Sequence, residues 1–68
     1  MLRDIDTVKL IFGLKVHQLR QELDLSYQQL SERTGLAISY LHNIEKGKKY
    51  PKADKILALA RALGTDYN

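Results

Sequence analysis

The apolar positions of this chain recur mostly every three or four residues, which is the spacing of one face of an α-helix. The first helix has Asp6 or Thr7 as a possible cap, because either side chain can accept the first free amide hydrogens. Residues 1–5 are expected to fray before it. The apolar stripe of this helix consists of Val8, Phe12, Val16, Leu19 and Leu23.

Two short helices are predicted next. Ser26 and Gln29 have the spacing of a capping box, in which each side chain covers a free backbone amide of the other residue. A second helix therefore runs from Tyr27 to Arg33, and Gly35 supplies the positive φ at which helices commonly end. The same apolar spacing predicts a third helix over residues 37–46.

A fourth helix completes the pattern. Gly47 terminates the third helix, and the turn that follows is extended because the residue before Pro51 avoids the helical region. Apolar residues then return at helical spacing from Lys52 to Leu63, and Gly64 closes this helix. No segment indicates a strand, so residues 1–68 are predicted to form a single all-α domain.

Size and composition narrow the functional classes. A chain of 68 residues has a thin core, since a domain of this size buries only about 60% of the surface that its unfolded chain exposes. A core this thin is not expected to enclose a substrate cavity. No Cys is present, and His17 and His42 fall on different helices, so the usual ligand spacing of a zinc site is lacking. We therefore expect no enzyme, no metal site and no cofactor. Neither a membrane span nor a signal peptide is apparent, so the expected location is the cytoplasm.

Charge distribution is more informative than net charge. Eleven Lys and Arg against eight Asp and Glu give a formal charge of +3, which is too mild to identify a partner. Five lysines, opposed only by Asp54, are concentrated between residues 46 and 55. They are Lys46, Lys48, Lys49, Lys52 and Lys55. Such a cluster is typical of a phosphate-binding surface, and a solvated lysine-rich loop is the alternative.

The two short helices over residues 27–46 have the features of a helix-turn-helix. Few residues join them, so they must cross at a large angle, which requires a small residue at the closest approach and a glycine in the turn. Ser31 and Gly35 occupy these positions. The apolar anchors of the motif are Leu30, Leu36, Leu41 and Ile44.

Many further positions stand in the register of one known family. They are Phe12-Gly13 through Leu19-Arg20, Leu25-Ser26, Leu30, Gly35-Leu36, Ser39-Tyr40-Leu41, Ile44-Glu45, Gly47, Pro51 and Ala60-Arg61-Ala62-Leu63-Gly64. In these the chain resembles the phage-repressor and Cro-like regulators, also called the xenobiotic-response-element (XRE) family. The resemblance implies a compact lambda-repressor-like DNA-binding domain of four to five helices, with the second helix of the motif in the major groove.

The resemblance also implies which side chains face the bases. They are Ile38, Ser39 and Asn43, with Ala37 near the groove wall and His42 beside it. Asn can pair with adenine, Ser can serve several bases, and Ile can contact a thymine methyl group. Apart from the family, Ile38 is an apolar side chain on the face away from Leu41 and Ile44. A partner that covers it is therefore favoured, and an isolated exposed Ile is the alternative.

Phosphate contacts are expected at the two edges of the motif. The candidates are Tyr27, Gln28, Lys46, Lys48, Lys49 and Tyr40. For Tyr40 the alternative is burial of the ring in the core. Contacts of this kind position a protein on DNA without specifying sequence, and the free amides at the start of the second helix can contribute to them.

Three positions depart from the family pattern. Tyr27 stands where relatives usually carry Gln, so a phenol would have to make the contacts to phosphate and to the recognition helix. Ser31 replaces a usual Ala, and its hydroxyl is expected to donate to a carbonyl one turn earlier. Ala37 provides no side-chain cap, which costs about 1 kcal/mol. Arg20 and Glu45 match positions that pair in relatives, so a salt bridge is predicted there.

The sequence therefore predicts sequence-specific binding of double-stranded DNA by a bacterial or phage transcriptional regulator. Relatives usually bind as homodimers on two-fold symmetric operators. Residues 65–68 look like the start of a fifth helix, belonging to a longer regulator whose C-terminal part would hold effector or dimer contacts. The alternative is an antitoxin or protein-interaction module, which the broad apolar stripe formed by Leu10, Ile11 and Leu14 favours. The operator, the regulated genes and the choice between activation and repression are left open.

Overall fold

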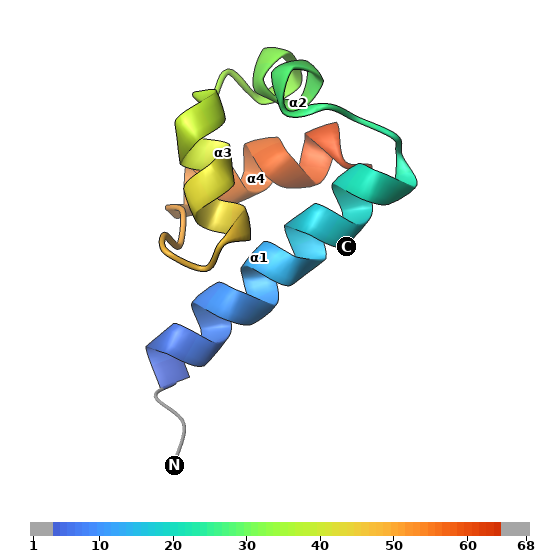
Figure 1. Ribbon diagram of the computed structural model, residues 1–68. Coiled ribbons are helices and arrows are strands. Elements are labelled where there is room, and N and C mark those ends of the chain that lie inside the picture. The colour runs from blue at the N-terminus through green and yellow to red at the C-terminus, as the bar shows by residue number, and fades with distance from the viewer. Residues whose placement is uncertain (1–3, 65–68) are drawn as a thin grey trace.

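Four helices account for most of residues 4–64, the part of the chain that the computed structural model describes (Figure 1). They are α1 (Asp4–Glu22), α2 (Tyr27–Thr34), α3 (Ile38–Glu45) and α4 (Ala53–Ala62). No strand occurs in this part of the chain, so the predicted all-α fold is confirmed. Residues 65–68, predicted to begin a fifth helix, lie outside the described residues.

The first helix begins earlier than its sequence indicates. Asp4 and Ile5 are already helical, so the prediction that they fray is wrong for these two residues, and residues 1–3 lie outside the described part. Asp6 and Thr7 belong to the helix and do not precede it as caps. Asp6 is still favourable there, because the free amides and the dipole at a helix N-terminus stabilise a negative charge.

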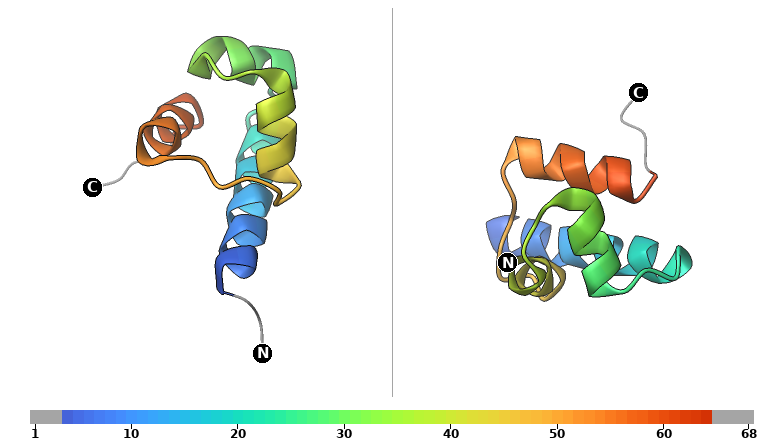
Figure 2. Two further views of the ribbon diagram at one scale, coloured as in Figure 1. Left: turned by 90° about the vertical axis from the view of Figure 1, so that its left-hand side faces the viewer. Right: turned by 90° about the horizontal axis from the view of Figure 1, so that it is seen from above.

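The helices enclose a small core. α1 lies beside α3, α4 stands on the other side of the molecule, and α2 contacts both α3 and α4 at one end (Figure 2). Leu30, Leu41 and Ile44 are fully buried, as predicted. The cluster around them consists of Val16, Leu25, Leu36, Leu59 and Leu63.

Two residues of the predicted α1 stripe are outside this core. Val8 is 43% exposed and Leu23 is 46% exposed. The N-terminal part of α1 projects beyond the other helices (Figure 1). Val8 lies on this part of the helix, where it lines a shallow surface hollow together with Phe12 and Tyr50. Leu23 follows the last residue of α1, where helical periodicity no longer sets the direction of the side chain.

The ends of α2 follow the local sequence signals. Ser26 Oγ accepts from the amide of Gln29 at 3.0 Å, and Gln29 Oε1 accepts from the amide of Ser26 at 2.8 Å, which completes the predicted capping box. Gly35 has a φ of 77° and donates its amide to Ser31 O at 2.7 Å. Both ends of α2 are therefore fixed by residues within it or next to it.

The hydroxyl of Ser31 has a different partner from the one predicted. It donates forward to Leu36 O at 2.6 Å, across the turn. The carbonyl one turn before Thr34, that of Leu30, accepts the Thr34 hydroxyl at 2.8 Å. Thr34 Oγ1 also accepts from the amide of Leu36 at 3.1 Å. Two hydroxyls thus hold the turn, because the sharp crossing of α2 and α3 brings the Leu36 carbonyl within reach of Ser31.

Candidate nucleic-acid interface

The outer face of α3 carries the side chains that were predicted to face bases. Ala37 is the N-cap of this helix and makes no side-chain capping hydrogen bond, as expected from its methyl group. Ala37, Ile38 and Ser39 are exposed, and Ile38 keeps 43% of its surface accessible. Leu41 and Ile44 hold the opposite side of the helix in the core. The first turn of α3 is therefore free to meet a partner.

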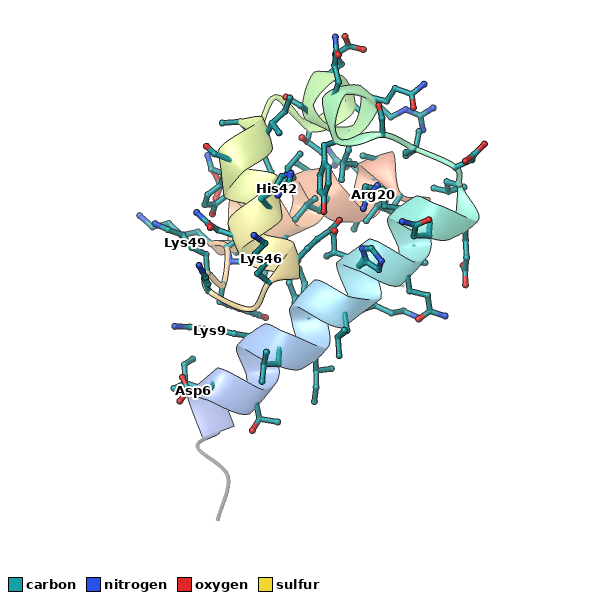
Figure 3. The ribbon with its side chains drawn as sticks, viewed as in Figure 1. Asp6, Lys9, Arg20, His42, Lys46 and Lys49 are labelled. Carbon is teal, nitrogen blue, oxygen red and sulfur yellow. The ribbon has the colours of Figure 1, made fainter. Side chains whose placement is uncertain are left out.

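His42 and Asn43 are half-buried, so they are less open than the first turn of α3. The His42 ring stacks on Tyr27, with ring centroids 4.0 Å apart and planes inclined by 29°. His42 and Lys46, one turn later, lie on the same side of α3 (Figure 3). The stack fixes the orientation of the imidazole, which sequence reasoning did not predict.

A lysine-bearing loop follows α3. The amides of Lys48 and Lys49 both donate to Asn43 O, at 2.9 and 3.3 Å, so the loop folds back on the end of the helix. Gly47 makes this possible with a φ of 77°. Lys46, Lys48 and Lys49 are all exposed. Three positive side chains are thereby gathered at one end of the outer face of α3.

The other phosphate candidates differ in accessibility. Gln28 is exposed in the first turn of α2. Tyr40 is half-buried and packs against the core, which matches the alternative given for its ring. Its contact with phosphate stays a prediction.

Glu45, the last residue of α3, is the centre of a polar cluster. Its side chain is only 4% exposed, and Oε2 accepts from Arg20 Nε at 2.8 Å, so the predicted salt bridge is present. Oε1 accepts from the Tyr27 hydroxyl at 2.7 Å and from Arg20 Nη2 at 3.2 Å. Arg20 also donates Nη1 to Leu25 O at 2.8 Å. One carboxylate thus joins α1, α2 and the end of α3.

Tyr27 performs one of its two predicted roles within this cluster. Its ring lies against His42 and 4.0 Å from the guanidinium carbon of Arg20, and its hydroxyl donates to Glu45. A phenol therefore makes the expected contact with α3. The contact of Tyr27 with phosphate stays a prediction, and the structure lends it no support because the only hydroxyl proton is donated inside the protein.

His17, an exposed residue of α1, belongs to the same cluster. Its Nδ1 lies 2.9 Å from Glu45 Oε1 and 3.3 Å from Arg20 Nη2. A signal for this was present in the sequence, because residues three apart on a helix share a face and His17 precedes Arg20 by three. The partner, however, comes from a helix distant in sequence.

Gly13 sets how closely α1 approaches α3. A Cβ atom on this residue would lie 2.8 Å from Glu45 O and closer still to Ile44 O. The backbone of α1 therefore touches the terminal carbonyls of α3 directly. This contact and the Glu45 cluster hold the C-terminal end of α3 against α1.

The cluster makes stability depend on pH. Burial by itself would raise the pKa of Glu45, but hydrogen bonds from Arg20, Tyr27 and His17 and the charge of Arg20 hold this pKa below its ordinary value of 4.5. A lowered folded-state pKa contributes stability that is complete above the unfolded-state pKa and is lost as pH falls through the folded-state pKa.

We therefore expect the free energy of unfolding to fall as acid is added below pH 4.5, the ordinary pKa of Glu45. Urea denaturation followed by circular dichroism, from about pH 6 to about pH 3, measures it. Glu45→Gln removes the titrating group, so its stability should decline less over the same range. Parallel declines in the two proteins would contradict the assignment to Glu45.

Neither a metal-binding cluster nor a membrane-crossing helix is found among the described residues. No group of three or more His, Asp or Glu side chains is placed to hold a metal ion within residues 4–64. None of the helices in this part of the chain has the length and apolar character needed to cross a membrane. The outer face of α3 with its adjoining lysines is the candidate site, because it combines exposed side chains on a fixed helix with exposed positive charge.

Comparison with known proteins gives consistent matches. A family model described as helix-turn-helix matches residues 16–68. A propionyl-CoA carboxylase regulator from Cereibacter sphaeroides is 36% identical over 58 residues, which are 85% of this chain but only 13% of that protein. An uncharacterized HTH-type transcriptional regulator from Sinorhizobium fredii is 32% identical over 63 residues, which are 93% of this chain and 80% of that protein.

A solved structure has a similar fold. The restriction-modification controller protein C.AhdI from Aeromonas hydrophila superposes with a TM-score of 0.84 at 32% identity. The match covers 88% of this chain and 91% of the controller protein. The likeness therefore extends over most of both chains.

Proposed function

The chain belongs to the helix-turn-helix family of DNA-binding transcriptional regulators, and from this premise we propose that α3 is its recognition helix and enters the major groove of double-stranded DNA. One observation carries the proposal. The outer face of α3 is open, while its C-terminal end is held by Glu45 and Gly13 and is flanked by a lysine-bearing loop. A recognition helix needs an accessible face to contact the bases and a fixed orientation to place its side chains.

The base contacts come from side chains along this face. Ile38 makes an apolar contact, for which a thymine methyl group is suited, and Ser39 donates to or accepts from a base edge. Asn43 pairs with adenine in the same groove. Ala37 lies against the groove wall, and His42 is presented beside the bases in the orientation that the Tyr27 ring gives it.

The phosphate contacts flank the bases on two sides. Lys46, Lys48 and Lys49 bind phosphates near the C-terminal end of α3, where all three are exposed. Gln28 and the free amides at the start of α2 bind a phosphate on the other side of the groove. Tyr27 acts as a positioning residue between these two regions, since its hydroxyl and ring contact α3 itself.

The working form of the regulator is a homodimer on a two-fold symmetric operator in the cytoplasm. Helix-turn-helix regulators commonly bind two half-sites separated by one helical turn of DNA, about 34–36 Å. A single recognition helix of eight residues offers few base contacts, and a second copy on an adjacent half-site doubles their number. Sedimentation of the protein with a selected operator duplex would report two chains per duplex.

The test separates contacts that position from contacts that specify. Binding sites are first selected from a pool of random duplexes, and affinity is then measured over a range of salt. Lys48→Gln should weaken binding to every duplex. Log affinity falls with log salt, and this variant should make the fall less steep by about 0.9, the share of one neutralised phosphate. Asn43→Ala should cost roughly 1–3 kcal/mol on the selected site and relax preference at one base pair.

Each variant is the control for the other. Asn43→Ala should leave the salt slope unchanged, and Lys48→Gln should leave the ranking of duplex sequences unchanged. If both variants lost affinity equally on selected and random duplexes, the division between base and phosphate contacts would be wrong. Binding to DNA that does not respond to salt would reject the proposed function as a whole.

A second candidate is an antitoxin or protein-interaction module with this fold. The observation in its favour is the apolar surface on α1, where Leu10, Ile11 and Leu14 are 53%, 61% and 65% exposed. Binding to a protein through this surface would bury apolar area and respond little to salt. The salt series above distinguishes the two candidates, which are not mutually exclusive.

A further inference from the structure

We infer that the phosphate-binding surface continues from the helix-turn-helix onto the N-terminal part of α1, where Lys9 contacts a DNA backbone phosphate beyond the C-terminal end of α3. This inference rests on the proposed function, because it requires that DNA approach the outer face of α3. It adds a contact that lies outside residues 16–68, the part of the chain that matches the helix-turn-helix family model.

The packing of α1 brings Lys9 to the lysine-bearing loop. Gly13 touches the terminal carbonyls of α3, and Lys9 precedes Gly13 by one helical turn on nearly the same face of α1. The neighbour of Lys9, Leu10, packs on the loop, because a Cβ atom on Gly47 would lie 2.6 Å from Leu10 Cδ2. Lys9 is therefore placed where α1 passes the end of the recognition helix.

The side chain of Lys9 extends to the same side of the molecule as that of Lys49 (Figure 3). Lys46 lies at the C-terminal end of α3, where the chain passes from α3 into the loop. These three residues come from α1, from α3's C-cap and from the loop after it. They form a short row of positive charge at one edge of the outer face of α3. With α3 in the major groove, a DNA backbone that borders the groove would pass along this edge.

The charge of Lys9 is available for a ligand. None of the ion pairs among the described side chains includes Lys9. The residue is half-buried, so its stem is held while its amino group reaches outward. A partly held side chain loses less entropy on binding than a fully mobile one. Asp6, about one turn earlier, lies on the same side of α1 (Figure 3). Its negative charge ends the positively charged surface at this point.

A structural role for Lys9 makes a different prediction. The carbonyls at the end of α3 carry the negative end of the helix dipole, and a nearby lysine can stabilise them without touching DNA. That role would lower the free energy of unfolding in a Lys9 variant and leave the number of neutralised phosphates unchanged. The salt slope of binding is thus the quantity that separates the two roles.

The experiment compares the full chain with Lys9→Gln and Lys15→Gln. Lys15 is the matched control, because it is an exposed lysine of the same helix and lines the apolar hollow between α1 and α4 together with Phe12 and Leu59. The probe is a fluorescent duplex of random sequence and about two helical turns, ~20 base pairs, since phosphate contacts do not need an operator. Affinity is measured by fluorescence anisotropy over a range of salt, and urea denaturation is measured on each protein.

We expect Lys9→Gln to make the fall of log affinity with log salt less steep by about 0.9. Lys15→Gln should keep the slope of the wild-type protein. Equal slopes for Lys9→Gln and the unchanged protein would overturn the inference, whether or not stability falls. A decrease that is the same for both variants would also overturn it, because it would reflect net charge alone. If the unchanged protein itself shows no salt-dependent binding, the proposed function fails first.

Discussion

Gly13→Ala is expected to lower the free energy of unfolding by roughly 1–3 kcal/mol or more, since a side chain forced into a filled space displaces its neighbours. The neighbours here are backbone atoms, because the added Cβ would meet Glu45 O at 2.8 Å and Ile44 O at a shorter distance. Backbone carbonyls at a helix end cannot rotate away as a side chain can. Helix α1 would have to move off α3, which also disturbs the orientation of the recognition helix.

The opposite sign is expected if only helix propensity mattered. Ala is favoured over Gly inside a helix by about 1 kcal/mol, so a Gly13→Ala protein of unchanged or higher stability would contradict the close contact. Urea denaturation followed by circular dichroism gives the stability, and DNA affinity measured below the unfolding midpoint reports the orientation of α3. Both quantities should fall together.

Gly35 provides a matched control with the reverse properties. No atom lies within 4 Å of a Cβ built on Gly35, but its φ of 77° is unfavourable for other residues. Gly35→Ala should cost about 1–2 kcal/mol through conformation alone, and Gly35→Asn less, since Asn tolerates this region. At Gly13, Asn should be worse than Ala because it is larger. An identical ranking of substitutions at the two glycines would show that space does not limit Gly13.

Glu45→Ala should cost about 3–5 kcal/mol, the usual result of removing one partner from a buried ion pair. The side chain of Arg20 is 8% exposed and would lose its only carboxylate partner among the described ion pairs. The Tyr27 hydroxyl would also lose its acceptor. Domains of this kind have about 5–15 kcal/mol of stability in total, so much of the margin would be lost. Thermal and urea denaturation would measure the change.

A double variant tests whether the loss comes from the uncompensated charge. Arg20→Met combined with Glu45→Leu replaces the pair by apolar side chains of similar size, which is often neutral or stabilising for buried ion pairs. We expect this protein to be more stable than Glu45→Ala, although the carbonyl of Leu25 loses the Arg20 donor. A double variant that is less stable than Glu45→Ala would mean that the hydrogen bonds matter more than the charge.

The ends of α2 depend on local sequence signals. The capping box at Ser26 and the glycine at position 35 act through neighbouring residues only, and α2 begins at Tyr27 as predicted. The burial of Leu30, Leu41 and Ile44 followed from helical periodicity. The same periodicity overstated the core at Val8 and Leu23, because it identifies an apolar face without showing whether another element covers that face.

The resemblance to relatives supplied the Arg20 and Glu45 pair and a contact of Tyr27 with α3, but not the rest of the cluster. That Tyr27 stacks on His42 and that His17 reaches Glu45 depend on how α1, α2 and α3 meet. The hydroxyl of Ser31 likewise found its acceptor across the turn, where the crossing of two helices brought the Leu36 carbonyl near. Each of these partners comes from a different segment of the chain.

The sequence by itself thus determined the four helices, the helix-turn-helix over residues 27–46 and the exposed face of α3. These features depend on interactions between residues a few positions apart. The tertiary structure decided how far along α1 the recognition helix sits, and so which side chains complete its surroundings. That position is set by the contact of Gly13 with the end of α3, and it brings Lys9 beside the lysine-bearing loop. Helical spacing cannot reveal such a placement, because it shows which way a side chain faces and not what lies opposite.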